Sequence, residues 1–448
     1  MKKVAVISLG CDKNRVDTEH MLYRISRGGH AICDVADAEV IIINTCAFIE
    51  SARQESIDVI LSCAELKKTG KLQRLIVTGC LPQKYRAELI AELPEVDAFL
   101  GAFEYSKIEE AIDGAPFAEI AATATAAAET EDASRFEADE NAGRLLSTYP
   151  HVAYVKIAEG CNNKCTFCTI PSIRGAYRSR RISDIVREVE GLARDGAEEI
   201  ILVAQDVTRF GSDRGALELT ELLTELEKTA VKRIRLLYCY PETVTDELIQ
   251  KIASSKKIVK YIDVPLQHCN DRILKLMNRR VTRAYIDGLA ARLKANGIAM
   301  RTTLMVGFPS ETEEEFAELV EFVRSVKPQY AGVFAYSKED GTPAARLKGQ
   351  IPKAVKKRRV DALGAACAEA TRAFNESLVG KTVEVVYEDA DYDRGLFVGR
   401  ADFQSPEVDG RVYFTSEEAV DVGKTYSVEI SHCDDYDLYG KVKNEFTE

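Results

Sequence analysis

The chain has 448 residues with a formal charge of −12, and its length predicts about three domains. Apolar residues at 46% and charged residues at 29% exclude a disordered chain. The absence of any run of 18 apolar residues excludes a membrane-spanning helix. The negative charge and the 12 cysteines are the two features that need an explanation.

The cysteines do not indicate a secreted disulfide scaffold, because they are too dilute in a chain of this length. The apolar stretch after Lys2 and Lys3 is only seven residues long and is not followed by a small-residue cleavage site, so we expect no secretory signal. The sequence therefore predicts a cytoplasmic protein in a reducing compartment, whose cysteines have a use other than disulfide formation.

Residues 1–113 alternate short apolar runs with amphipathic helical stretches. The runs VAVISLG, VIIINT and RLIVTG are rich in Val and Ile, which is typical of buried parallel strands. We predict an open parallel α/β domain over 1–113. An Ala/Thr-rich and then acidic stretch over 114–146 indicates a linker.

Six further rounds of strand and helix are expected within residues 147–375. Six successive βα units favour an open or partial (β/α)6 barrel, although a doubly wound sheet has the same periodicity. A long basic helix is expected at about 354–378. The predicted strands lie at 151–158, 199–206, 233–239, 261–267, 299–308 and 330–337.

Residues 376–448 have an all-β pattern that carries most of the negative charge. Five short strands in under 70 residues predict a small antiparallel barrel of the oligonucleotide-binding (OB) type. From Lys381 to Glu448 there are 17 acidic and 7 basic residues, a net charge of −10. Such a barrel would repel a phosphate backbone, so we expect a basic partner and no direct nucleic-acid binding. Solubility alone is the alternative explanation.

Three cysteines, Cys161, Cys165 and Cys168, form a C-x3-C-x2-C motif directly after the first strand of the predicted barrel; we call them the core cysteine set. Loops at this end of barrel strands build active sites. Three thiolates can bind a [4Fe–4S] cluster and leave its fourth iron open, as in radical S-adenosylmethionine (SAM) enzymes. A zinc knuckle is the alternative, but His151 is poorly placed to complete it.

A second group, Cys11, Cys46 and Cys80, is spread along the first domain; we call it the N-terminal cysteine set. Each member follows an apolar strand, at intervals of 35 and 34 residues. Because the carboxyl ends of parallel strands line one crevice, we expect the three thiols to converge and to bind a second cluster. Burial as small core residues is the alternative. Three other cysteines are expected only to pack: Cys33, Cys239 and Cys367.

These motifs resemble the methylthiotransferase family of radical SAM enzymes over essentially the whole chain. The similar segments are SLGCDKNRVDTE, NTC, TGC, KIAEGCNNKCTFCTIPSIRG and the terminal barrel, which resembles a TRAM domain. Three segments are most similar to the branch that modifies ribosomal protein S-twelve: SLGC-x-KN at 8–14, AEGCNNKCTFC at 158–168 and PLQH at 265–268.

The resemblance implies two [4Fe–4S] clusters and SAM as cofactors. The cluster on the core cysteine set would cleave SAM to a radical that takes a hydrogen from the β-carbon of an aspartate. The cluster on the N-terminal cysteine set would present a methylated sulfur to the substrate radical. The implied partners are the basic ribosomal protein, an external electron donor and a sulfur donor. A tRNA-adenosine methylthiotransferase and a zinc-stabilised RNA-binding adaptor are the alternative functions.

Residues at the predicted strand ends are candidate SAM contacts, because the active-site face of the barrel lies there. The segment VGFPSET at 306–312 is also an ordinary strand end followed by a helix start, which is the alternative for the glycine in it. The candidates are Phe167, Gln205, Asp206, Arg301 and Gly307.

Further candidates stand beside the motifs. Asn14 and Asp17 follow Cys11 and are expected to shape the loop around the N-terminal cysteine set, with helix capping as the alternative. Gln267 and His268 end the fourth barrel strand, where a role in the site competes with simple packing of the histidine.

Overall fold

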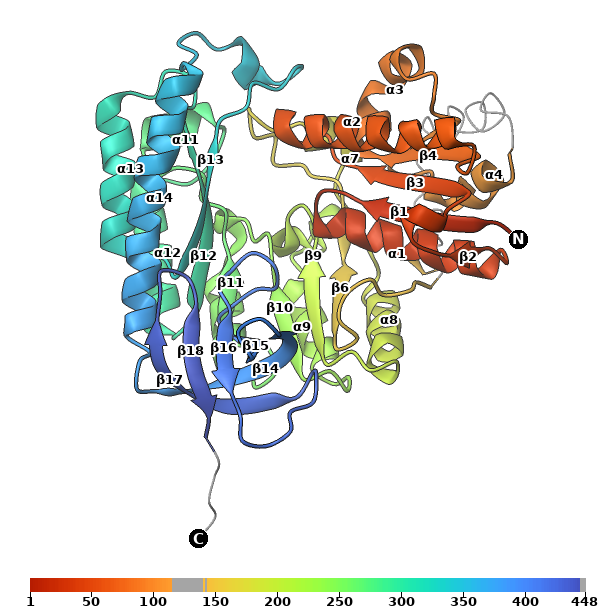
Figure 1. Ribbon diagram of the computed structural model, residues 1–448. Coiled ribbons are helices and arrows are strands. Elements are labelled where there is room, and N and C mark those ends of the chain that lie inside the picture. The colour runs from red at the N-terminus through yellow and green to blue at the C-terminus, as the bar shows by residue number, and fades with distance from the viewer. Residues whose placement is uncertain (115–139, 142, 444–448) are drawn as a thin grey trace.

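The computed structural model describes residues 1–114, 140–141 and 143–443, which form an N-terminal domain, a central domain and a terminal barrel (Figure 1). The linker expected over 114–146 lies mostly outside these residues. No helix in the described part of the chain is long and apolar enough to span a membrane.

The N-terminal domain is an open α/β sheet, as predicted. Its elements are β1 (Lys3–Ser8), α1 (Asp12–Arg27), β2 (Ala31–Ile32), β3 (Val40–Thr45), α2 (Glu50–Glu65), β4 (Arg74–Gly79), α3 (Cys80–Glu92), β5 (Ala98–Gly101) and α4 (Ile108–Asp113). The sheet order is β2-β1-β3-β4-β5, and every neighbouring pair is parallel. The central strand β3 is buried along its whole length, as expected for a strand covered by helices on both faces.

The central domain contains the six predicted strands in consecutive order. They are β6 (Val152–Lys156), β9 (Glu199–Val203), β10 (Arg233–Leu236), β11 (Tyr261–Asp263), β12 (Ala299–Val306) and β13 (Tyr330–Ala335). They form two parallel sheets, β10-β9-β6 and β11-β12-β13, joined by a bridge between Ile234 and Ile258. β6 and β13 end the two sheets and are not paired with each other in the described residues, so the barrel is partial, as predicted.

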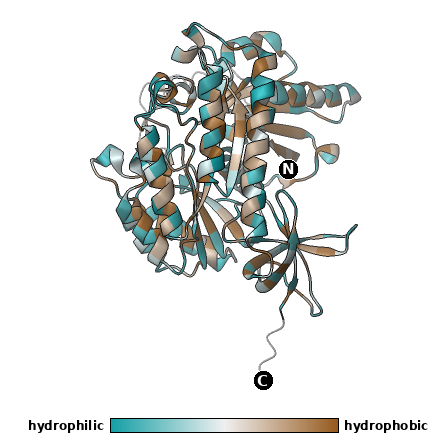
Figure 2. Cartoon of the chain, turned by 90° about the vertical axis from the view of Figure 1, so that its left-hand side faces the viewer, coloured by the Kyte–Doolittle hydropathy of each residue, from teal (hydrophilic) through white to brown (hydrophobic). Residues whose placement is uncertain are grey.

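Helices surround these strands and enclose the largest hydrophobic core of the protein. They are α8 (Ile182–Arg194), α9 (Leu219–Leu226), α10 (Asp246–Ser254), α11 (Asp271–Leu276), α12 (Arg283–Ala295), α13 (Glu313–Val326) and α14 (Lys353–Glu376). Figure 2 shows hydrophilic and hydrophobic residues alternating along helices of this domain. Cys239 and Cys367 are buried in this core and Cys33 packs against the N-terminal one, which confirms their expected packing role.

The terminal domain is a closed five-stranded barrel of order β14-β15-β16-β18-β17. Its strands are β14 (Thr382–Asp391), β15 (Leu396–Ala401), β16 (Val412–Thr415), β17 (Thr425–Cys433) and β18 (Leu438–Val442). All neighbouring pairs are antiparallel except β16 and β18, which are parallel. After β16 the chain crosses the barrel, β17 pairs with β14, and β18 then fills the place between β17 and β16. Closure leaves no exposed strand edge.

Buried ion pairs hold the terminal barrel against the amino ends of the central strands. Glu199, at the start of β9, accepts hydrogen bonds from Arg235 of β10 at 2.8 Å and from Arg400 of β15 at 2.7 Å. All three side chains are almost completely buried. The Tyr261 hydroxyl, from the start of β11, donates to Asp409 at 2.7 Å. The terminal barrel therefore closes the end of the central barrel that is opposite to the carboxyl ends of its strands (Figure 1).

Replacing Glu199 with Gln should lower the free energy of unfolding by about 3–5 kcal/mol, because the buried Arg235 loses its carboxylate partner and the buried Arg400 keeps only Glu388. Burial alone would raise the pKa of the Glu199 carboxyl, but Arg400 and Arg235 lower it. Its contribution to stability is therefore fully present above the unfolded pKa of about 4.3 and is lost as the pH falls towards the lowered folded value. Urea unfolding at several pH values measures both effects.

The matched control is Glu225→Gln, which removes an exposed ion pair with Lys228. It should change the free energy of unfolding by less than about 0.5 kcal/mol. Equal losses in the two variants would contradict the structural role of Glu199.

Candidate active site

The structure brings the N-terminal cysteine set together at the carboxyl ends of β1, β3 and β4. The strand register pairs Ser8 with Asn44, and Asn44 with Thr78. Thr45 pairs with Gly79, so Cys46 and Cys80 follow paired residues directly. The three chain segments therefore leave the sheet side by side, and the predicted convergence of the thiols is present.

Asn14 of α1 ties these segments together. Its Nδ2 donates to the carbonyls of Leu9 at 3.1 Å and Thr45 at 3.0 Å. Its Oδ1 lies 3.9 Å from Cys11 Sγ and 3.7 Å from Cys80 Sγ. Asn14 is completely buried, and α1 has no side-chain cap. Asn14 thus shapes the loop, as predicted, and does not cap the helix.

Two glycines in the motifs allow the segments to approach so closely. Gly10 and Gly79 have φ values of +94° and +97°, a backbone conformation that other residues rarely adopt. A Cβ atom on Gly10 would lie 2.8 Å from the Cβ of Cys46, and one on Gly79 would collide with the Asn44 side chain. The glycine before Cys11 and Cys80 is therefore a steric requirement of the cysteine arrangement.

The fold also sets the charge of these thiols. α1 begins directly after Cys11 and α3 begins at Cys80, so two helix amino termini face the set and favour anionic sulfur. Burial raises the pKa of the Cys46 thiol to about 12. Burial also raises the pKa of Cys80, while the nearby Arg174 guanidinium acts in the opposite direction. Burial thus disfavours the thiolate at Cys46 and Cys80, and metal binding has to displace these protons.

The core cysteine set lies in the loop between β7 (Ala158–Glu159) and α7 (Ile170–Arg174). The Cys161 N–H donates to the Gly175 carbonyl and the Cys168 N–H to the Cys165 carbonyl, both at 3.1 Å, which closes the loop. A cavity of about 280 Å³ lies beside Cys165 and Cys168 and is bounded on its other side by residues 340–343. Burial raises the pKa of the Cys161 and Cys168 thiols to about 11 and about 12.

Asp206, a predicted site residue, supports this loop. Its carboxylate accepts hydrogen bonds from Asn163 Nδ2 at 2.7 Å and from the Thr208 hydroxyl at 2.8 Å. Its backbone carbonyl accepts one from the Tyr177 hydroxyl at 2.8 Å. Because Asn163 lies between two cysteines of the motif, Asp206 positions the loop. Its contact with SAM stays a prediction.

Two residues that the sequence did not single out face Cys165. The Tyr240 hydroxyl lies 3.8 Å from Cys165 Sγ, and Arg279 Nη1 lies 3.9 Å from it. The Arg279 guanidinium also stacks over the Tyr240 ring, 4.0 Å from its centroid. A buried guanidinium beside a thiol favours the anionic sulfur that iron binds. No motif marks Arg279, because only the fold brings it to the cysteine loop.

The end of β10 lies between the two cysteine sets. Tyr240 contacts the core set, and two residues earlier the Tyr238 hydroxyl donates to the Asp12 carboxylate at 2.8 Å, next to Cys11. The Lys13 ammonium lies 3.3 Å from the centroid of the Tyr238 ring. One three-residue segment therefore touches the surroundings of both sets, so the sets face the same region of the protein.

Three further candidates lie at this end of the barrel. The Gln205 amide donates to Glu159 at 2.5 Å. Phe167 packs in a small apolar cluster beneath the cysteine loop. Gly307 follows β12 with a φ of +72°, and its N–H donates to the Glu311 carboxylate. Their contact with SAM stays a prediction.

Arg301 and His268 have their partners elsewhere. Arg301 pairs with Asp263 at 3.0 Å and with Asp409 of the terminal barrel at 3.3 Å. These ion pairs place Arg301 at the interface between the central domain and the terminal barrel, and its contact with SAM stays a prediction. His268 is completely buried, and its Nε2 lies 3.2 Å from Glu311 Oε1, which favours the packing alternative.

Both cysteine sets offer thiol sulfur as the donor for a metal centre. A [4Fe–4S] cluster takes its thiolates on different irons, so its ligands stand farther apart than those of a tetrahedral zinc. Two sets of three thiols, each beside a cationic side chain, have the donor chemistry that such clusters require.

Family models match three parts of the chain, and a solved structure has a similar fold. Residues 155–323 match the Radical SAM superfamily, 3–101 the Uncharacterized protein family UPF0004, and 379–442 the TRAM domain. The fold is similar to that of a radical S-adenosylmethionine methyltransferase, TsrM, from Kitasatospora setae, with a TM-score of 0.55 and 13% identity over 83% of this chain and 89% of that chain. The protein is a radical SAM enzyme, a class that uses SAM and a [4Fe–4S] cluster.

Full-length relatives give the family. Proteins named ribosomal protein uS12 methylthiotransferase RimO from Clostridium botulinum and Acetivibrio thermocellus are 44% and 45% identical to this chain, each over 99% of both sequences. One from Clostridioides difficile is 44% identical over 99% of this chain and 100% of its own length. The chain belongs to this methylthiotransferase family.

Replacing Asp206 with Ala should reduce the iron bound by the core cysteine set, because Asn163 loses the carboxylate that holds the loop. After anaerobic reconstitution, iron analysis should fall from about eight per chain towards about four, with the N-terminal set still occupied. The exposed Asp195→Ala variant is the control and should keep the full content. Equal iron in all three proteins would contradict the positioning role.

Proposed function

We propose that the protein adds a methylthio group to ribosomal protein uS12, at the β-carbon of an aspartate. The substrate is the one in the names of its full-length relatives, and the aspartate is implied by the resemblance of the SLGCDKN motif. The observation that supports this most is the placement of two three-cysteine sets on either side of the end of β10. Two open irons in one site match a reaction that needs both a radical and a sulfur.

We propose one [4Fe–4S] cluster on each cysteine set. When bound, the clusters supply the electron that cleaves SAM and the sulfur that is transferred. The protein holds the thiols in place through the glycine turns, Asn14 and Asp206, and it supplies positive charge at Arg174, Arg279 and Lys13. Nearby cations stabilise anionic sulfur, which lowers the free-energy cost of burying it.

We propose that the acidic terminal barrel helps to dock the basic ribosomal protein. Exposed carboxylates lie on its surface, among them Asp393, Glu417, Glu418 and Asp434. The barrel lies at the amino ends of the central strands (Figure 1), whereas the core cysteine set follows a carboxyl end, so we expect the barrel to contact a part of the partner away from the modified aspartate. The proposal places the enzyme in the cytoplasm, without direct nucleic-acid contact, with an external electron donor and an external sulfur donor.

The substrate assignment predicts which macromolecule gains mass. Reconstituted, reduced protein is incubated with SAM, sulfide and either uS12 or tRNA, and the products are analysed by mass spectrometry. We expect uS12 to gain one methylthio group on an aspartate, and a uS12 variant with that aspartate replaced by Ala to gain none. Modification of tRNA alone would contradict the proposed substrate.

The two-cluster assignment predicts that the sets fail in different ways. Cys161→Ala should abolish SAM cleavage, because the core set loses a ligand at the site of reduction. Cys46→Ala should still form 5′-deoxyadenosine but insert no sulfur. Cys367→Ala, which changes a buried cysteine outside both sets, is the control and should keep both reactions. Sulfur insertion by both of the first two variants would refute the assignment.

A further inference from the structure

Arg174 connects the two cysteine sets physically. It is the last residue of α7, in the segment that begins just after Cys168, and the following Gly175 carbonyl accepts the N–H of Cys161 at 3.1 Å. Its side chain extends to the other set, where Nη2 lies 3.5 Å from Cys80 Sγ. One residue in the loop of the core set therefore touches a sulfur of the N-terminal set.

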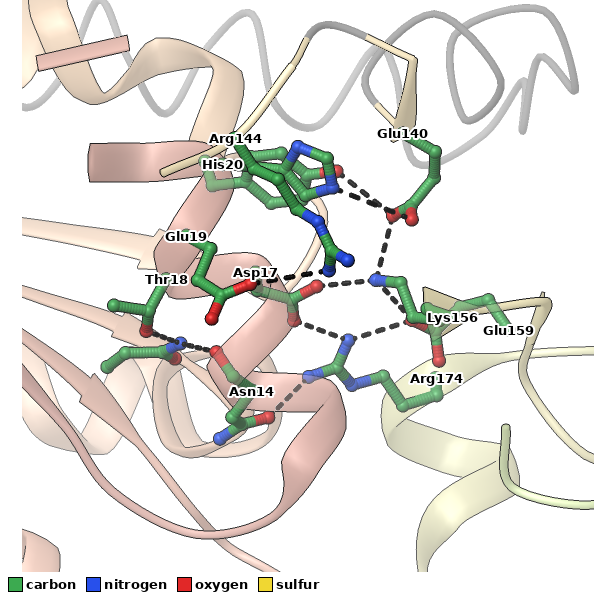
Figure 3. Close-up of polar contacts among 12 residues, drawn as sticks. Asn14, Asp17, Thr18, Glu19, His20, Glu140, Arg144, Lys156, Glu159 and Arg174 are labelled. Carbon is green, nitrogen blue, oxygen red and sulfur yellow. Dashed lines mark hydrogen bonds and ion pairs between the residues drawn. The ribbon is translucent and has the colours of Figure 1, made fainter. Parts of the chain in front are cut away.

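The guanidinium of Arg174 is held in one orientation by buried partners from both domains (Figure 3). Nη1 donates to Asp17 and to Glu159, both at 3.0 Å. Nη2 donates to Asn14 Oδ1 at 2.7 Å. The side chain is only 2% exposed. A planar guanidinium with donors fixed in this way cannot turn away from the sulfur, unlike a flexible lysine.

The positive charge of Arg174 offsets the negative charge of the buried carboxylates around it. The neighbouring Lys156 ammonium binds Asp17 at 2.5 Å, Glu140 at 2.8 Å and Glu159 at 3.3 Å (Figure 3). Three buried carboxylates thus face two buried cations, before any charge on the sulfur is counted. Loss of Arg174 would leave excess negative charge beside Cys80, which disfavours every further electron placed there.

We propose that Arg174 is a positioning residue that donates a charge-assisted hydrogen bond to the Cys80 sulfur and raises the reduction potential of the cluster on the N-terminal cysteine set. The inference rests on the proposed two-cluster function. Hydrogen bonds to cluster sulfurs and nearby positive charge stabilise the reduced state, which carries one more negative charge. Arg174 would thereby keep the sulfur-carrying cluster reducible while fixing its place relative to the core set.

The test measures the potential of the N-terminal cluster alone. In the full chain, Cys161→Ala, Cys165→Ala and Cys168→Ala together remove the core cluster, and the remaining cluster is titrated by redox potentiometry with electron paramagnetic resonance detection. We expect Arg174→Gln to lower the ratio of reduced to oxidised cluster about tenfold at a fixed applied potential, which is a shift of about 59 mV for one electron. An unchanged midpoint potential would overturn the proposal.

Arg174→Lys covers the case in which the glutamine variant does not hold a cluster. Lysine keeps the charge but not the fixed fork of donors, so the potential should fall less and the iron–sulfur stretching frequencies in resonance Raman spectra should shift. Spectra and potential equal to those of the parent would overturn the proposal.

Arg180→Lys is the matched control. Arg180 is equally buried and donates to Glu188 at 2.6 Å and to the Lys156 carbonyl at 2.8 Å, and its hydrogen bonds in the described residues involve no cysteine. It should leave the potential unchanged, and a shift equal to that of Arg174→Lys would overturn the specific role of Arg174. Iron and sulfide analysis of the parent, the triple cysteine variant with Arg174 intact, separates the proposed two-cluster function from the proposed role of Arg174. A parent without a cluster refutes the proposed function, whereas a cluster with a potential insensitive to Arg174 refutes only this inference.

Discussion

The shared direction of parallel strands is the constraint on which the site depends. In the N-terminal sheet, the register of β1, β3 and β4 makes three cysteines from distant parts of the chain end at one edge. In the central barrel, the same rule places the core cysteine loop and Tyr240 at the carboxyl ends of their strands. The carboxyl ends of the strands of the two domains face each other, so that short segments are sufficient to bring the cysteines of each set together.

Buried charges fix how the two domains face each other. Lys156 and Arg174 of the central domain pair with Asp17 of α1, and Arg53 of α2 pairs with Glu339 on the far side. A buried charge without its partner costs several kcal/mol, so these pairs permit little sliding between the domains. That rigidity matters for a reaction in which a radical must meet a sulfur bound by the other domain.

Local patterns were sufficient for much of the architecture and for the convergence of both cysteine sets. Apolar runs predicted the six central strands and three strands of the N-terminal sheet, whereas β2 and β5 were not predicted. The parallel pairing of β16 with β18 depends on how the chain crosses the barrel. Asn14 and Asp17 were found because they stand beside a cysteine. Arg174 was missed because its contact with Cys80 spans 94 residues, and no local signal encodes such a contact. Strand position alone did not reveal that Arg301 pairs with Asp409 of the terminal barrel.

The position of the terminal barrel determines which of its charged residues can attract a partner. Several of its charged residues form ion pairs with the central domain, namely Arg400, Asp402 and Asp409. Glu407 pairs with Arg15 of α1 at 2.7 Å, whereas other carboxylates of the barrel, among them Asp393 and Glu418, are exposed. The exposed carboxylates can act on the encounter, because a field of one sign attracts a basic protein over about a Debye length, roughly 8 Å at physiological salt. The proposed function therefore assigns recognition of the partner to the terminal barrel, and chemistry at the target residue to the cysteine sets of the other two domains.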